Sequence, residues 1–104
     1  MKLFIVTRRD LHPGALLAQT VHAASEFAIR HRSTFERWHT ESNTIIVKTA
    51  GSEQELHRLL DRAQDRQLLH ASFREPDMGG SLTSVALEPQ ARSLVRDFPL
   101  AFSN

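Results

Sequence analysis

The chain has 104 residues, of which 40% are apolar and 24% are charged, the balance of a single globular domain over residues 1–104. It contains no cysteine, which excludes disulfides, thiol nucleophiles and cysteine-ligated zinc. The formal net charge is only +1, so a nucleic-acid-binding surface would have to come from local clustering of arginines.

The N-terminal part of the chain predicts a strand followed by a helix. Residues 2–7 are rich in β-branched and aromatic side chains without alternation, which is typical of a strand covered on both faces. Pro13 and Gly14 interrupt this pattern, and a helix is expected over residues 15–30. The apolar stripe expected to face the core consists of Leu17, Val21, Ala24 and Ala28, widened by Leu16, Ala23 and Phe27.

The middle of the chain predicts a second strand and a second long helix. Residues 31–43 are polar and are expected to hold a short helical turn, and residues 44–49 form a nearly continuous apolar strand. Ser52 and Glu55 fit a capping box, which predicts a helix that ends near Gln67.

The C-terminal third predicts two strands and a last helix. Residues 69–73 form a short third strand, residues 75–80 a turn, and residues 83–87 a fourth strand. The last helix begins at Glu88 or Pro89 and runs to about Arg96; the pattern does not decide whether the last two strands pair.

This order of elements predicts an α/β fold: a mixed four-stranded sheet covered by helices in three layers. No stretch approaches the roughly 20 apolar residues that span a bilayer. The first apolar run is too short for a signal peptide, so a cytoplasmic protein with no membrane partner is expected.

Two polar side chains stand out in the first helix. Gln19 and His22 are three residues apart and share a helical face, which Glu26 continues. His22 could act as a general base or simply hydrogen-bond a neighbouring backbone group, and Gln19 could orient a substrate or serve as a structural hydrogen bonder. In the fourth strand Thr83 and Ser84 are expected to alternate, so that only one faces any site.

The histidines do not indicate a metal site, and no metal or other cofactor is expected. They show neither H-x3-H nor H-E-x-x-H spacing and fall on different predicted elements. They are His12, His22, His31, His39, His57 and His70.

Four segments, in the same order, resemble the peptidyl-tRNA hydrolase 2 family. Arg8-Arg9-Asp10-Leu11 resembles the family's R-x-D-L, and residues 17–23 resemble its A-x-Q-x-x-H-A helix in a shifted register. Residues 52–56 resemble S-E-x-E-L, and residues 83–89 resemble T-x-x-A-I-x-P. The resemblance implies the family's three-layer fold, a homodimer, and a tRNA or peptidyl-tRNA partner.

The chain departs from the family in the two loops that carry its chemistry. The G-K-G-K loop before the first helix is replaced by His12-Pro13-Gly14-Ala15, which has no lysine. Counted back from Thr83 without gaps, the family's D-A-G-x-T falls on residues 73–77, so that Phe73 takes the place of the aspartate and Asp77 that of the threonine. Losing one fixed oxyanion donor costs about 3 kcal/mol of transition-state stabilisation.

Two functions therefore remain open. The resemblance implies a peptidyl-tRNA, or aminoacyl-ester, hydrolase that uses His22, Gln19 and Thr83 with a carboxylate from Asp77 or Glu75. Its tRNA-binding residues would be Arg8, Arg9, Arg74 and a protonated His12. The alternative is a catalytically lapsed member that keeps the fold as an RNA-, protein- or small-molecule-binding module.

Overall fold

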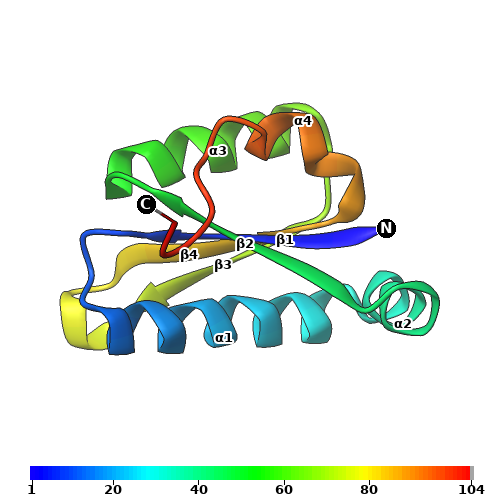
Figure 1. Cartoon of the computed structure of the whole chain (residues 1–104), viewed down its shortest axis with the longest axis horizontal. Helices are drawn as coiled ribbons and strands as arrows, with labels where there is room; N and C mark the ends of the chain where they lie inside the picture. Colours follow the sequence, from blue (N-terminus) through cyan, green and yellow to red (C-terminus); the bar gives the residue numbers. More distant parts are fainter. Residues whose placement is uncertain (104) are drawn as a thin grey trace.

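The computed structural model, which describes residues 1–103, has three layers (Figure 1). The middle layer is a four-stranded sheet in the order β2-β1-β4-β3. Helices α1 and α2 cover one face of the sheet, and α3 and α4 cover the other. The predicted α/β class and mixed sheet are confirmed. The strands are β1 (Lys2–Arg8), β2 (Thr44–Ala50), β3 (His70–Glu75) and β4 (Ser81–Leu87).

Burial on both faces explains the continuous apolar run of the first strand. β1 pairs in parallel with β2 on one side and antiparallel with β4 on the other, and its residues Leu3 to Val6 are all buried. β3 and β4 pair antiparallel, which answers the question that the sequence left open. No helix within residues 1–103 is long and apolar enough to cross a membrane.

The buried side of α1 (Pro13–Arg30) differs from the predicted stripe. Leu17 and Val21 are 56% and 63% exposed, whereas Leu16, Ala23 and Phe27 are buried. Two polar side chains, Gln19 and Thr20, occupy the middle of the buried side because hydrogen bonds to the sheet satisfy them. A pattern drawn from apolar residues alone therefore centred the stripe on the exposed Leu17 and Val21, whereas the residues expected only to widen it are the buried ones.

The segment predicted as a short turn is a second helix, α2 (Arg32–Glu41). Its one buried residue is Trp38, whose indole Nε1 donates to the Thr44 carbonyl at 2.8 Å. Ion pairs between residues four apart, such as Arg32 with Glu36, run along its exposed side. With so few apolar positions, α2 carries almost no periodic signal.

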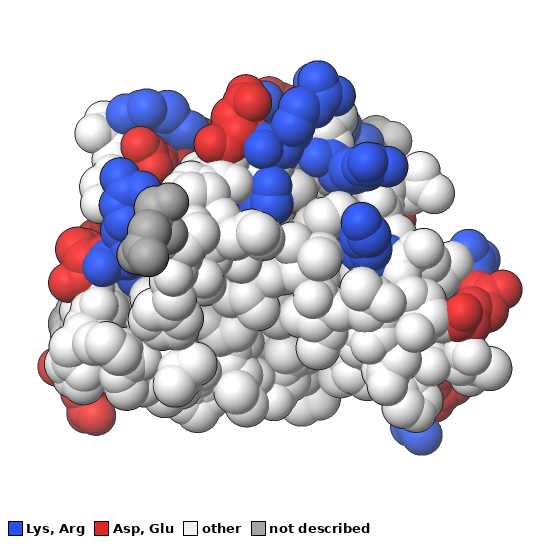
Figure 2. Space-filling view, in the orientation of Figure 1, with Lys and Arg blue, Asp and Glu red and all other residues white. Residues whose placement is uncertain are grey.

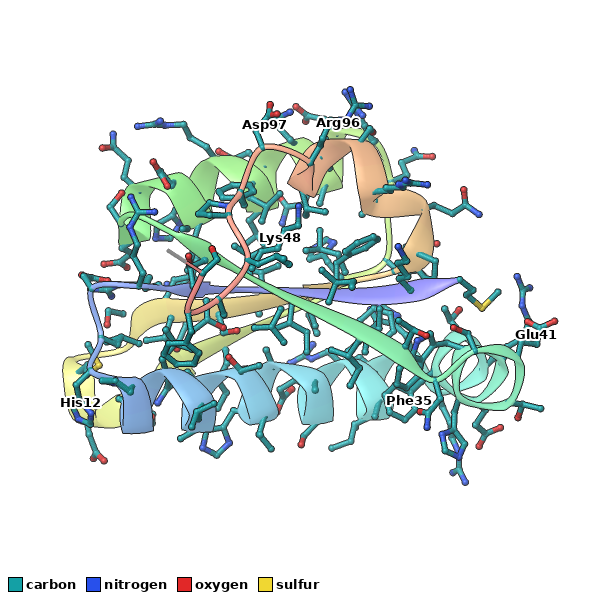
Figure 3. All side chains as sticks on the ribbon, viewed as in Figure 1. His12, Phe35, Glu41, Lys48, Arg96 and Asp97 are labelled. Carbon is teal, nitrogen blue, oxygen red and sulfur yellow. The ribbon has the colours of Figure 1, made fainter. Side chains whose placement is uncertain are left out.

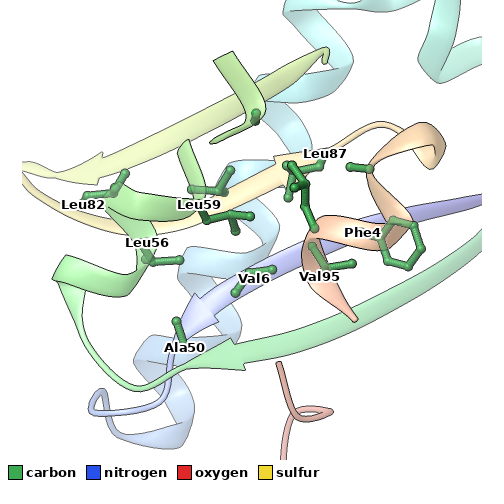
Figure 4. Close-up of a cluster of buried hydrophobic side chains, with 12 residues drawn as sticks. Phe4, Val6, Ala50, Leu56, Leu59, Leu82, Leu87 and Val95 are labelled. Atoms are coloured by element: carbon green, nitrogen blue, oxygen red, sulfur yellow. The ribbon is translucent and has the colours of Figure 1, made fainter. Parts of the chain in front are cut away.

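The capping prediction for α3 (Glu53–Asp65) is confirmed at its first half. Ser52 Oγ accepts from the Glu55 amide, whereas the Glu55 carboxylate accepts from the Gly51 amide at 2.6 Å rather than from Ser52. Leu56, Leu59 and Ala63 face the sheet, where they meet side chains of β1 and β4 (Figure 4).

The C-terminal part is less helical than predicted and covers part of the β2 edge. A 3-10 turn at Pro89–Ala91 precedes α4, which spans only Arg92–Val95. Beyond it, Thr49 donates to the Pro99 carbonyl and Ala101 donates to the Val47 carbonyl, both at 2.9 Å. Lys48 reaches up from β2, as Figure 3 shows, and its Nζ donates to the Val95 carbonyl at 2.9 Å.

Candidate functional site

A β-bulge in β4 turns two neighbouring hydroxyls toward α1. Phe73 is opposite Ser84 and Arg74 is opposite Leu82, so Thr83 is an extra residue in β4. Thr83 and Ser84 consequently lie on the same side of the sheet. Thr83 contacts the Gln19 amide on α1, and Ser84 reaches α1 through the hydroxyl of Thr7. The expected alternation of Thr83 and Ser84 is wrong, because the bulge turns both side chains toward α1, although only Thr83 contacts Gln19.

The Thr83 hydroxyl holds the side chain of Gln19. Thr83 Oγ1 donates to Gln19 Oε1 at 2.7 Å and also lies 3.2 Å from the Phe73 carbonyl. Thr83 is fully buried and Gln19 is 5% exposed. Within residues 1–103 the Gln19 amide nitrogen has no hydrogen-bond partner, and it is not sealed from solvent. The amide is thus fixed at its oxygen and free to donate at its nitrogen.

The second hydroxyl of the bulge, that of Ser84, belongs to a closed structural network. Thr7 Oγ1 lies 2.7 Å from both Thr20 Oγ1 and Ser84 Oγ, and Thr20 donates to the Leu16 carbonyl at 2.8 Å. These groups satisfy one another in the interior between β1, β4 and α1. The network fixes how far α1 stands from the bulge.

His22 lies one turn after Gln19 and stacks on Phe73. The two rings are 4.3 Å apart between centroids and inclined by 13°. The imidazole is exposed, and its nitrogens form no hydrogen bond with any residue that the structure describes. The alternative of a locally hydrogen-bonded His22 is therefore not observed. Stacking orients the ring and leaves both nitrogens open to solvent.

Phe73 joins the two halves of the cluster, and the sequence did not select it as a site residue. Its carbonyl lies 3.2 Å from Thr83 Oγ1, and its ring stacks on His22. The signal was present: the ungapped comparison placed Phe73 where the family carries its aspartate. In the structure the Phe73 ring contacts His22.

The two candidate carboxylates are not part of this cluster. Glu75 ends β3, and Asp77 is exposed in the 3-10 turn Pro76–Met78. Figure 1 shows the turn at the same end of the sheet as the start of α1. Within residues 1–103, neither carboxylate forms a hydrogen bond or an ion pair with Gln19, His22 or Thr83.

Arg8 is held by other parts of the protein. Its guanidinium donates to both Asp10 oxygens, at 2.8 and 3.0 Å, and lies 3.9 Å from Glu53 Oε1. These contacts raise the pKa of Arg8 and lower the pKa of Asp10. The pKa of Glu53 is lowered mainly because its carboxylate accepts from the Leu82 amide. Arg8 thus ties β1 to α3 and β4.

The other three candidate tRNA-binding residues are separated. His12 caps α1, as Figure 3 shows at the first turn, and its Nδ1 accepts from the Ala15 amide at 3.4 Å. Arg74 is exposed on β3, which is the far edge of the sheet from β2. Arg9 is exposed beside Gly51, where an added methyl group would come within 3.2 Å of Nη2. Of these residues, only Arg9 lies beside further arginines.

The cluster offers a proton acceptor and an amide donor on one helical face. An exposed imidazole can take a proton from water, and a fixed amide N–H can stabilise negative charge that develops on a carbonyl oxygen. No three His, Asp or Glu side chains within residues 1–103 lie close enough to hold a metal ion.

A comparison with known families agrees with the sequence motifs and with the three-layer fold. The model of the family described as peptidyl-tRNA hydrolase PTH2 matches residues 1–101. The match includes the bulged strand, the capped α3 and the helix that carries Gln19 and His22. This chain belongs to the peptidyl-tRNA hydrolase PTH2 family.

Proposed function

We propose that this protein hydrolyses the ester between a peptidyl or N-blocked aminoacyl group and tRNA. The observation that carries the proposal is the arrangement on α1: Gln19 is fixed by Thr83, and the free imidazole of His22 lies one turn away. Family membership supports the reaction class.

The proposed reaction uses water as the nucleophile. His22 takes a proton from the water molecule as it attacks the ester carbonyl, and the Gln19 amide nitrogen donates to the oxyanion that forms. Collapse of the tetrahedral intermediate breaks the bond to the ribose oxygen, which receives the proton from His22. The products are a free carboxylic acid and deacylated tRNA. Asp77, from the 3-10 turn, or Glu75, from the end of β3, would supply the carboxylate of the site once a substrate is bound.

Single-turnover hydrolysis of an N-blocked aminoacyl-tRNA tests this proposal. The wild-type chain, His22→Ala and Gln19→Ala are compared with an active family member in the same assay. Turnover that each substitution reduces supports the proposal. Wild-type turnover that survives His22→Ala, or no wild-type turnover at all, contradicts it.

The binding-module alternative rests on two different observations: the loop before α1 has no lysine, and within residues 1–103 no carboxylate forms a hydrogen bond or an ion pair with His22. In that case the chain would bind tRNA without hydrolysing it. Measuring tRNA binding in the same preparations separates the two functions, because a lapsed member retains binding and shows no turnover.

We also propose a homodimer in the cytoplasm, formed through the uncharged face over α1 and β2. Leu17, Val21 and Ile45 are exposed on these elements, beside a hollow of about 290 Å³ lined by α1, α2 and β2. Figure 2 shows this face almost free of charged side chains. A second copy suits it, since a two-fold contact places the same uncharged patch on itself and needs no charge complementarity.

A further inference from the structure

We propose that a second hollow, on the α3 side of the sheet, binds the phosphodiester backbone of RNA through Arg9, Arg58 and Arg62. The inference rests on the proposed tRNA substrate and adds two arginines of α3 that no family motif selected. The hollow has a volume of about 400 Å³. Arg9 enters it from the end of β1, and the Phe98 ring lines its wall.

The three guanidiniums are available for a ligand. Arg9, Arg58 and Arg62 are exposed, and within residues 1–103 none of them forms an ion pair. This distinguishes them from Arg8, Arg30, Arg32 and Arg37, each of which is paired with a carboxylate. An arginine fork matches the geometry of a phosphate, which makes an unpaired group of arginines a suitable phosphate site.

The two carboxylates in the hollow offset this positive charge only in part. Glu55 accepts from the Gly51 amide at 2.6 Å, which holds its carboxylate against the start of α3. Asp97 is exposed and lies beyond α4, as Figure 3 shows. The side chains that line the hollow therefore carry an excess of one positive charge, three arginines against two acids. Figure 2 shows basic side chains over the α3–α4 side of the molecule, with acidic side chains among them.

The wall of the hollow is held in place. The segment after α4 pairs with β2 through Thr49 and Pro99, and Lys48 donates to the carbonyls at the end of α4. An adjoining hollow of about 460 Å³ shares Arg9, Thr49 and Pro99 with the arginine-lined hollow and continues to Pro13 at the start of α1. An RNA strand bound at the arginines would thus pass Arg9 and reach the first turn of α1. A cluster of arginines beside an aromatic ring is typical of single-strand binding.

The test measures binding of a fluorescein-labelled single-stranded RNA by anisotropy over a range of salt concentrations. The double variant Arg58→Gln/Arg62→Gln is compared with Arg92→Gln/Arg96→Gln, which removes the same charge from exposed arginines of the α4 region that lie outside the hollow. We expect the first variant to bind about tenfold more weakly. We also expect its salt slope to fall by about 1.4, from two phosphate contacts at roughly 0.7 each. The control variant should bind like the wild type.

Equal binding by the two double variants would overturn the inference, and so would saturation of the hollow by inorganic phosphate in a chain that does not bind RNA. Hydrolysis is scored separately. If RNA binding depends on Arg58 and Arg62 but the chain shows no turnover, the RNA site in the hollow is supported and the proposed hydrolase activity is contradicted. If the Arg58→Gln/Arg62→Gln variant turns over substrate with an unchanged KM, the proposed hydrolase activity is supported and the RNA site in the hollow is overturned.

Discussion

Thr83 and Gln19 form a hydrogen bond of 2.7 Å between two buried side chains that are 64 residues apart in the sequence. We predict that Thr83→Val lowers the free energy of unfolding by about 1–3 kcal/mol, because Gln19 Oε1 loses its donor while it stays buried. Urea unfolding measures the change. Thr83→Ser keeps the hydroxyl and removes only the methyl group, so it is the matched control; a Thr83→Val variant as stable as the wild type would contradict the prediction.

His22 contacts the protein through stacking alone, which allows its chemistry to be separated from its packing. His22→Phe keeps a flat ring over Phe73 and removes the proton acceptor. We expect its stability to change by less than about 0.5 kcal/mol, and its single-turnover rate to fall by about 10²–10⁴. A His22→Phe variant with wild-type turnover would exclude His22 as the base.

The ion pair of Arg8 with Asp10 makes part of the stability depend on pH. The hydrogen bond from Arg8 lowers the pKa of Asp10, so its contribution is present at neutral pH and is lost as pH falls through the folded-state value, below 3.8. Asp10 is half exposed, so Asp10→Asn should cost only about 0.2–1 kcal/mol at pH 7.

Unfolding of the wild type and Asp10→Asn, measured from pH 7 downward, tests this expectation. The difference between them should vanish below the folded-state pKa of Asp10. Asp61→Asn, which removes an exposed carboxylate without an ion pair in the described chain, is the control. A difference in the free energy of unfolding that stays constant at all pH values would contradict a stabilising ion pair of Asp10 with Arg8.

The corrected orientation of α1 predicts opposite results for two of its apolar residues. Phe27 is fully buried, so Phe27→Ala should cost about 3–5 kcal/mol, whereas Val21→Ala should cost less than about 0.5 kcal/mol in the monomer. Denaturant unfolding of both variants at low protein concentration measures this. A loss of several kcal/mol in Val21→Ala, similar to that in Phe27→Ala, would contradict the exposed position of Val21.

The proposed dimer predicts that one charge on the α1–β2 face changes the oligomeric state. Val21→Glu should shift the chain to a monomer in sedimentation velocity, because the carboxylate would be buried without a partner. Gln54→Glu adds the same charge to an exposed site on α3 and should stay dimeric. A wild-type monomer at every concentration, or a dimer that survives Val21→Glu, would contradict this interface.

The elements that the sequence predicted well are those whose signals are local. The unbroken apolar runs of β1 and β2 reflect burial on both faces, and Ser52 begins α3 through a hydrogen bond to a residue three positions away. The family's motifs were recognised for the same reason, since each of them occupies only a few consecutive residues.

What the sequence did not predict depends on distant partners. Gln19 and Thr20 are buried because β4 and β1 supply hydroxyls to them, and nothing near these two residues in the sequence reveals those hydroxyls. The bulge at Thr83 depends on the pairing of β4 with β3. The contact of Phe73 with His22 was not predicted because the two residues are 51 positions apart in the chain.

The segment after α4 also limits how sheets of this protein can associate. By pairing with Val47 and Thr49, it occupies backbone groups on the outer edge of β2 that would otherwise accept a strand from another molecule. Growth of one continuous sheet from copy to copy is blocked along that stretch. Two copies that meet along this stretch of β2 do so face to face, each keeping its own separate sheet, which favours a closed pair over an open-ended fibre.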